Sequence, residues 1–200
     1  MGGMVAARAR VVLLTGPSGC GKTRLTQRLG LPVLPLDNFY FNADRPGMPR
    51  RFGIVDWDSP LTWDALGAMG ALVALCENNE VAIPLYDIST SSRIGETTVS
   101  RGDSSIVIAE GIFAAELVEP CRELGILASA ICLTRPRWLA FIFRFSRDLK
   151  EARKPFFTLV RRGIGLFRAQ HGQVRQWEAQ GCHAMRMRAA IARIKELASD

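Results

Sequence analysis

Short apolar runs alternate along the chain with longer segments of mixed polarity. The runs are rich in Val, Ile and Leu, which is typical of parallel strands that are buried on both faces. The pattern predicts strands at 11–15, 32–36, 106–109 and 126–133, and helices at 21–30, 60–78 and 114–124. Their alternation predicts an α/β fold in three layers, with a parallel sheet between layers of helices.

A long segment between two of the sheet strands is predicted to form an insertion, at about 37–100. Residues 81–86 and 97–100 predict a strand pair that flanks a loop. Ser59 and Pro60 are suited to the N-cap and the first position of the helix that follows them.

The last part of the chain, about 155–198, is predicted to be mostly helical, with a break near Gly181. No final strand is expected before a helix at 184–197. Neither a repeat nor a low-complexity linker divides the sequence, so one domain over residues 1–200 is expected.

The first apolar run leads directly into a motif with the spacing G-x-x-x-x-G-K-[ST]. Its glycines let backbone N–H groups approach a polyphosphate without a Cβ in the way, and the following helix turns its positive end to the same anion. Lys22 is expected to reach the β- and γ-phosphates of ATP, and Thr23 is expected to bind Mg²⁺. The predicted nucleotide-binding residues are Gly16, Pro17, Ser18, Gly19, Cys20, Gly21, Lys22 and Thr23.

The five cysteines are odd in number and form no C-x-x-C pair, which predicts free thiols rather than disulfides or a zinc site. Cys20 differs from the others because it lies inside the phosphate-binding motif. Inward-pointing amides and Lys22 predict a lowered pKa for its thiol. Alkylation of Cys20 is expected to block ATP binding, with no catalytic role for the thiol itself.

Two acidic residues follow predicted sheet strands, Asp37 after the strand at 32–36 and Glu110 after the strand at 106–109. In open α/β sheets the ligand lies beyond the carboxyl ends of the strands, so both acids are expected beside the phosphate-binding motif. Asp37 is suited to orient an acceptor hydroxyl and take its proton. Glu110 is suited to hold Mg²⁺, directly or through water.

The loop at 37–59 combines aromatic and acidic side chains. Such a combination fits a pocket that stacks a flat ring and hydrogen-bonds sugar hydroxyls, although anchoring of the loop itself explains part of it. The side chains concerned are Phe39, Tyr40, Phe41, Phe52, Asp56, Trp57 and Asp58.

The net charge of +7 is concentrated in one segment. Ten of the 26 basic side chains lie at 135–168, whereas residues 1–134 carry more acidic than basic groups. This confinement argues against nucleic acid as a partner and favours a lid, at about 144–168, that closes over polyphosphate; a solvated helix face is the alternative. Since no apolar run approaches the ~18 residues of a membrane span, no membrane association is expected. The unpaired cysteines favour a cytoplasmic location. A homo-oligomer is left open.

The order of these motifs resembles the uridine kinase branch of the phosphoribulokinase/uridine kinase family. The resemblance covers about residues 11–170 and rests on G-P-S-G-C-G-K-T, D-N-F-Y, D-W-D-S-P, I-P-L-Y-D, A-E-G-I and R-F-S-R-D. It implies a three-layer P-loop kinase fold with a parallel sheet, a small strand-pair insertion and a helical lid.

The resemblance also implies roles for single residues. Asp37 is implied as the catalytic base. Lys22 and the lid residue Arg147 are expected to be further catalytic residues, and the lid residue Arg144 is implied as a nucleotide contact. Thr23 and Glu110 resemble the Mg²⁺-side groups. Asp58 resembles the acid that binds ribose hydroxyls. The residues of the substrate pocket are expected to be Tyr40, Trp57, Asp58, Tyr86 and Arg93.

The predicted activity is ATP- and Mg²⁺-dependent transfer of the γ-phosphate to a primary hydroxyl of a nucleoside or a similar small alcohol. The family's nucleoside kinases usually carry an aromatic residue and a pyrimidine-reading histidine where this chain has Ile88 and Ser91. Uridine and cytidine are therefore expected to be weak substrates. The alternatives are a kinase of another metabolite, such as pantothenate or a sugar, and a regulatory or non-catalytic P-loop protein.

Overall fold

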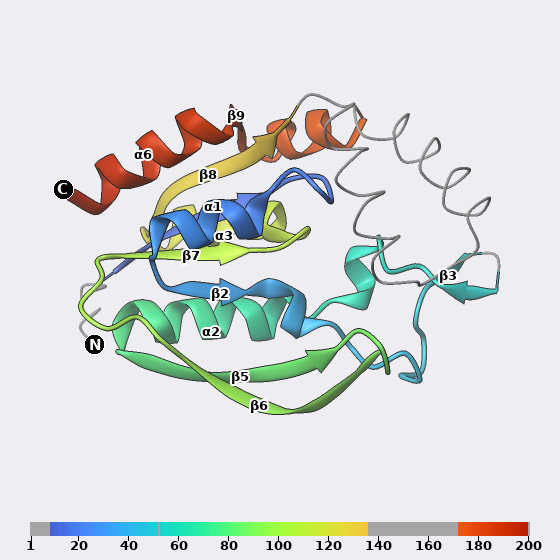
Figure 1. Ribbon diagram of the computed structural model, residues 1–200. Helices are drawn as coiled ribbons and strands as arrows, with labels where there is room; N and C mark the ends of the chain where they lie inside the picture. Colours follow the sequence, from blue (N-terminus) through green and yellow to red (C-terminus); the bar gives the residue numbers. More distant parts are fainter. Residues whose placement is uncertain (1–8, 52, 136–171, 200) are drawn as a thin grey trace.

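Five parallel strands form the central sheet of the computed structural model, which describes residues 9–51, 53–135 and 172–199 (Figure 1). The strands are β1 (Arg10–Thr15), β2 (Val33–Pro35), β7 (Ile106–Glu110), β8 (Leu127–Thr134) and β9 (His183–Arg186). They lie in the order β2–β7–β1–β8–β9. β1 and β7 are buried along nearly their whole length, because both faces of the sheet are covered.

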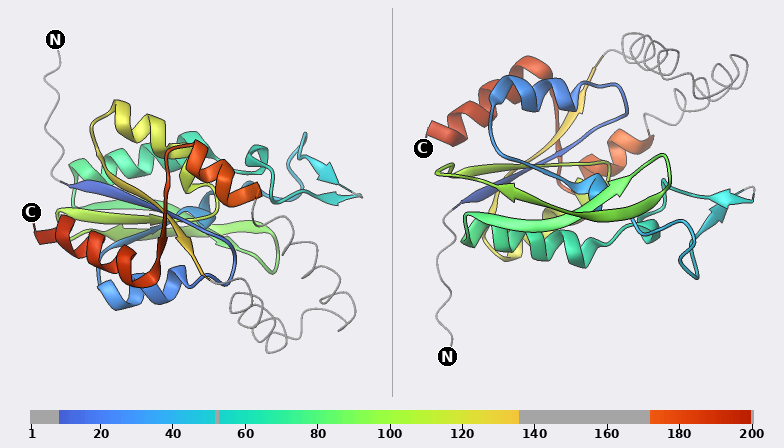
Figure 2. Two further views of the ribbon diagram at one scale, coloured as in Figure 1. Left: turned by 90° about the horizontal axis from the view of Figure 1, so that it is seen from above. Right: turned by 60° about the horizontal axis from the view of Figure 1, so that its bottom comes forward.

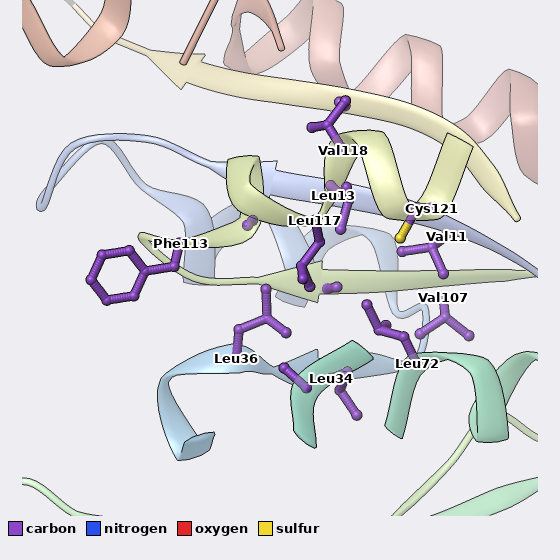
Figure 3. Close-up of a cluster of buried hydrophobic side chains, with 14 of the residues drawn as sticks. Val11, Leu13, Leu34, Leu36, Leu72, Val107, Phe113, Leu117, Val118 and Cys121 are labelled. Atoms are coloured by element: carbon purple, nitrogen blue, oxygen red, sulfur yellow. The ribbon is translucent and has the colours of Figure 1, made fainter. Parts of the chain in front are cut away.

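The helices form two layers, one on each face of the sheet (Figure 2). One layer holds α1 (Lys22–Leu29) and α6 (Met187–Ser199), which pack on Val12, Leu14 and Ile108. The other holds α2 (Ala65–Glu77), α3 (Val118–Glu123) and the helical segment 172–179. The larger core cluster lies under this second layer, with Phe113 and Leu36 at one end of it (Figure 3). The predicted three-layer fold is confirmed.

A long antiparallel strand pair, β5 (Glu80–Asp87) and β6 (Ser92–Ser100), lies outside α2. The predicted strand pair is therefore confirmed, although β6 begins earlier than expected. A second, short pair consists of β3 (Arg50–Arg51) and β4 (Ile54–Val55). Three turns of 3₁₀ helix complete the description, η1 (Leu36–Phe39), η2 (Pro60–Thr62) and η3 (Ala114–Leu117).

Two boundaries differ from those expected. The second long helix begins at Ala65, and its N-cap is Asp64, whose carboxylate accepts a hydrogen bond of 2.9 Å from the Gly67 N–H. Ser59 and Pro60 instead begin the short η2 turn. The prediction of no final strand was wrong, because β9 pairs in parallel with the second half of β8 before α6 begins. The side chains of β9 are polar or small and show no apolar pattern typical of a strand. The strand is defined by its backbone pairing with β8.

The strand register brings the carboxyl ends of three strands to one level. Glu110, the last residue of β7, stands opposite Leu14 of β1 and Pro35 of β2. The phosphate-binding motif after β1, the η1 turn after β2 and the segment after β7 therefore meet at one edge of the sheet, as the sequence predicted.

No helix in the described ranges is long and apolar enough to cross a membrane. The expected lid, at about 144–168, lies outside the described residues.

Candidate active site

The phosphate-binding motif forms a tight loop that only glycine permits at key positions. Gly16 and Gly21 have φ angles of +148° and +102°. A Cβ on Gly16 would lie 2.6 Å from the Leu133 carbonyl oxygen and 2.9 Å from Cys20 Sγ. The loop is therefore pressed against the end of β8, and any side chain at residue 16 would displace it.

The motif ends in the first turn of α1. Gly21 is the N-cap and provides no side chain to bind the first N–H groups of the helix. Lys22 folds back over the loop, and its Nζ donates a hydrogen bond of 2.9 Å to the Gly16 carbonyl. Thr23 is exposed in the first turn. These groups form a cradle of backbone donors, one cation and one hydroxyl, which suits a polyphosphate with a bound Mg²⁺.

Asp37 and Glu110 lie close enough to Lys22 for all three charges to interact. Asp37 is open to solvent on one side, but protein atoms displace much of the water around its carboxyl group, and this desolvation raises its pKa. Lys22 and the Ile112 N–H act in the opposite direction. Desolvation also raises the pKa of Glu110, with Lys22 lowering it and Asp37 raising it further. The three residues predicted from separate strand ends thus form one electrostatic cluster.

The η1 turn that carries Asp37 is held from two sides. Trp63 donates a buried hydrogen bond of 2.7 Å from Nε1 to the Leu36 carbonyl. On the other side, a Cβ on Gly111 would lie 2.7 Å from Leu36 Cβ and 3.0 Å from Asp37 Oδ1. Gly111 therefore allows the segment after β7 to approach Asp37. Trp63 was not predicted as a site residue, because an isolated tryptophan near the start of a helix has no motif around it.

Aromatic rings from three segments meet beside Asp37. The Tyr40 ring lies 5.5 Å from the Trp57 ring and 5.6 Å from the Tyr86 ring, and the Trp57 and Tyr86 rings are 6.3 Å apart. Tyr40 also donates a hydrogen bond of 3.3 Å to the Trp57 carbonyl. Desolvation, followed by the charges of Asp37 and Asp58, raises the pKa of Tyr40. Three of the residues predicted for the substrate pocket are thus adjacent, with Asp58 near them.

Arg93 is engaged by the protein itself. Its guanidinium donates to the carbonyls of Tyr40 and Phe39, at 3.0 and 3.2 Å, and lies 3.2 Å from Asp64 Oδ2. These bonds join β6 to the loop before α2. The expected contact of Arg93 with a substrate stays a prediction, and the observed bonds assign it the additional task of holding the Tyr40 backbone.

The expectation of a lowered pKa for the Cys20 thiol was wrong. The side chain is 1% exposed, and its burial raises the pKa, although Lys22 and Arg135 act to lower it. The nearby Lys22 is visible in the sequence, whereas the burial of Cys20 depends on the fold. Arg135 directly follows β8, and its guanidinium lies beside the position that a Gly21 Cβ would take.

Native Cys20 is therefore expected to react slowly with iodoacetamide at neutral pH, because each unit of raised pKa leaves about tenfold less thiolate. Cys20→Ser should retain its activity. Mass spectrometry of the labelled peptide measures the rate, and the denatured chain, in which all cysteines are accessible, supplies the reference. Fast labelling of Cys20 in the folded protein would contradict the observed burial.

Among the described residues, no group of three or more His, Cys, Asp or Glu is placed to hold a metal ion. Mg²⁺ bound to a nucleotide needs few protein ligands, because phosphate oxygens and water complete its coordination. Thr23 and Glu110 fit such a site. The predicted lid residues Arg144 and Arg147 lie outside the described residues.

Comparison with curated proteins found several relatives. The chain is 34% identical over 157 residues to a uridine kinase of Schizosaccharomyces pombe, which covers 71% of this chain and 32% of the relative. It is 35% identical over 150 residues to the inorganic pyrophosphatase TTM2 of Arabidopsis thaliana, covering 71% and 20%. A uridine kinase of Borrelia duttonii is 26% identical over 167 residues, covering 80% and 77%. The chain thus spans less than a third of the length of the first two relatives.

Comparison with solved structures finds other proteins that share this three-layer fold. A proposed fructose transport system kinase from Silicibacter sp. TM1040 superposes with a TM-score of 0.62 and 24% identity, over 93% of this chain and 92% of that protein. Phosphoribulokinase from Rhodobacter spheroides superposes with a TM-score of 0.50 and 15% identity, over 90% and 70%. At these identities the likeness shows the fold. No model of a protein family matches the chain.

Proposed function

We propose that the chain is a P-loop kinase similar to the uridine kinases, and that it transfers the γ-phosphate of ATP to a primary hydroxyl of a nucleoside or a similar small alcohol. The observation that carries the proposal is the cluster of Lys22, Asp37 and Glu110 at the mouth of the phosphate-binding loop. The cluster combines a cation for the transferred phosphoryl group, a base for the acceptor and an acid for the metal ion.

Each member of the cluster has a defined task in the proposed transfer. In this proposal the loop N–H groups and Lys22 bind the phosphates, and Thr23 and Glu110 are the residues that would hold Mg²⁺. When bound, Mg²⁺ neutralises charge on the phosphate oxygens. Asp37 accepts the proton of the acceptor hydroxyl as its oxygen bonds to the γ-phosphorus and the bond from that phosphorus to ADP breaks. Because its charge is weakly hydrated, Asp37 is a stronger base than an ordinary surface carboxylate.

The aromatic rings and Asp58 supply the acceptor side. Tyr40, Trp57 and Tyr86 offer ring faces and edges, and Asp58 lies near them with a carboxylate suited to hydroxyl groups. This chemistry fits a nucleoside, and it also fits a sugar or another small polyol.

Uridine and cytidine are expected to be phosphorylated at least about tenfold less efficiently than the best acceptor. The Ser91 hydroxyl donates a hydrogen bond of 3.4 Å to the Ile88 carbonyl, and Ile88 is 67% exposed. The Ser91 proton is thus used within its own turn, and the aliphatic Ile88 side chain has no polar group with which to recognise a pyrimidine. The measurement is kcat/KM for uridine, cytidine, purine nucleosides, pantothenate and hexoses, with ATP and Mg²⁺.

The same experiment tests the proposed function against its alternatives. ADP formation that depends on an added alcohol supports a kinase. Phosphate release from ATP or pyrophosphate without an acceptor would support a hydrolase, an outcome to which the similarity to the Arabidopsis pyrophosphatases gives weight. ATP binding without turnover would support a regulatory protein. Uridine or cytidine as best acceptor, with kcat/KM of about 10⁴ M⁻¹s⁻¹ or more, would overturn the specificity claim and retain the kinase.

A further inference from the structure

Thr15 is a polar residue in the buried, apolar strand β1. It is the last residue of β1, it is fully buried, and the phosphate-binding motif begins at the next residue. Its hydroxyl donates a hydrogen bond of 3.1 Å to the carbonyl of Ile112, which lies 97 residues later in the chain. A buried hydroxyl needs such a partner, but a valine of the same shape would fill the position without one.

The segment that receives this bond is attached to β1 at two points. The Gly111 N–H donates to the Leu14 carbonyl at 3.2 Å, and the Thr15 hydroxyl donates to the Ile112 carbonyl. Between these two points, Gly111 lies against Asp37, where an added Cβ would be 3.0 Å from Asp37 Oδ1, and the neighbouring Ile112 N–H lowers the pKa of the Asp37 carboxyl group. The segment therefore connects the end of β1 to the acid after β2, although β7 separates these strands in the sheet.

We propose that Thr15 is a positioning residue, which sets the distance between the phosphate-binding loop and Asp37 by fixing the orientation of Ile112. This inference rests on the proposed phosphoryl transfer and adds a residue to it. The transferred phosphoryl group is held by the loop that begins at Gly16, and the acceptor is held by Asp37. The loop and Asp37 must stay at a constant distance from each other, so that the acceptor hydroxyl can attack the γ-phosphorus in line.

The geometry around Asp37 supports this assignment. Gly111 lies so close to Leu36 and Asp37 that a Cβ there would meet both. The opposite side of η1 is fixed by Trp63 through the Leu36 carbonyl. A small rotation of Ile112 would therefore turn its N–H away from Asp37 or push the adjoining Gly111 against the carboxylate.

The test compares Thr15→Val, which keeps the shape and loses the hydroxyl, with Thr15→Ser, which keeps the hydroxyl. Thr15→Val is expected to lower kcat by roughly 10- to 100-fold, with little change in the KM for ATP, because misplacement of a reacting group affects the transfer step. Thr15→Ser should restore most of kcat. Thr134→Val is the matched control, since Thr134 donates the same kind of bond, of 3.1 Å, from the end of β8 to the Met185 carbonyl.

Hydrogen exchange of the Ile112 amide provides a readout that does not need activity. It should become faster in Thr15→Val, but not in Thr15→Ser or Thr134→Val. An unchanged kcat in Thr15→Val, or an equal loss in Thr134→Val, would overturn the positioning role. If Thr15→Val does not fold, Thr15→Cys, of similar size but with a weak donor, takes its place and should show the same loss. A wild-type chain that transfers no phosphate would instead refute the proposed function, while the exchange data would still test the link to Ile112.

Discussion

Replacing Lys22 with alanine is expected to abolish ATP turnover, with a loss of roughly 10³-fold or more, because the substitution removes the cation placed beside the transferred phosphoryl group. The Lys22 Nζ contacts the carbonyl of Gly16 at 2.9 Å and interacts with both Asp37 and Glu110. Its removal would also raise the pKa of each of these carboxyl groups further, because Lys22 is a charge that lowers them. The measurement is steady-state ADP formation with the best acceptor.

Folding should be nearly unaffected by this change, since Lys22 lies on the surface of the loop and fills no core cavity. Arg24→Ala is the matched control, because it removes one exposed cation from the same helix, two residues further along. Arg24→Ala should retain near-normal turnover. A Lys22→Ala variant that keeps wild-type activity would refute phosphoryl transfer at this loop.

Asp37→Asn is expected to lower kcat by about 10²–10⁴-fold, with the affinity for ATP almost unchanged. The amide keeps the shape of the carboxyl group and loses its basicity. The variant is compared with Asp103→Asn, which removes an exposed carboxylate far from the phosphate-binding loop. A loss of less than about threefold in Asp37→Asn would place the base elsewhere.

The raised pKa of Asp37 predicts where activity falls on the acidic side of the pH profile. The group must be ionised to accept a proton, and desolvation raises its pKa above the ordinary value for aspartate. Activity of the wild type should therefore fall, as pH decreases, at a higher pH than an ordinary aspartate would give. A limb that coincides with the ordinary aspartate pKa, about 3.9, would contradict the desolvated environment.

The raised pKa of Asp37 also affects the stability of the fold. Because the folded pKa lies above the unfolded one, the folded state binds more protons in the interval between them, and stability falls as pH rises through that interval. Ionised Asp37 thus destabilises the fold at neutral pH. Asp37→Asn is expected to melt at the same or a higher temperature than the wild type at pH about 7, while losing activity. A clear drop in its melting temperature would indicate that Asp37 has a structural role.

Local pattern alone determined the frame of the molecule. The apolar runs of β1 and β7 predicted strands buried on both faces, since few other structures accommodate consecutive Val, Ile and Leu. The spacing of the phosphate-binding motif predicted a tight glycine loop, and Gly16 has the positive φ that such a loop requires. Asp37 and Glu110 were predicted to meet because parallel strands end at one edge of a sheet.

The tertiary structure decided the remainder, through contacts between residues far apart in sequence. β9 is a strand because β8 offers it unpaired backbone groups, and its own side chains carry no such signal. The pKa of the Cys20 thiol is raised because the fold buries it, whereas its neighbours in sequence predicted the opposite. Arg93 and Thr15 obtained their roles from partners 54 and 97 residues away. Hydrophobic periodicity and motif spacing are local properties that a sequence displays, but desolvation and hydrogen-bond partners depend on which distant atoms displace water from a group.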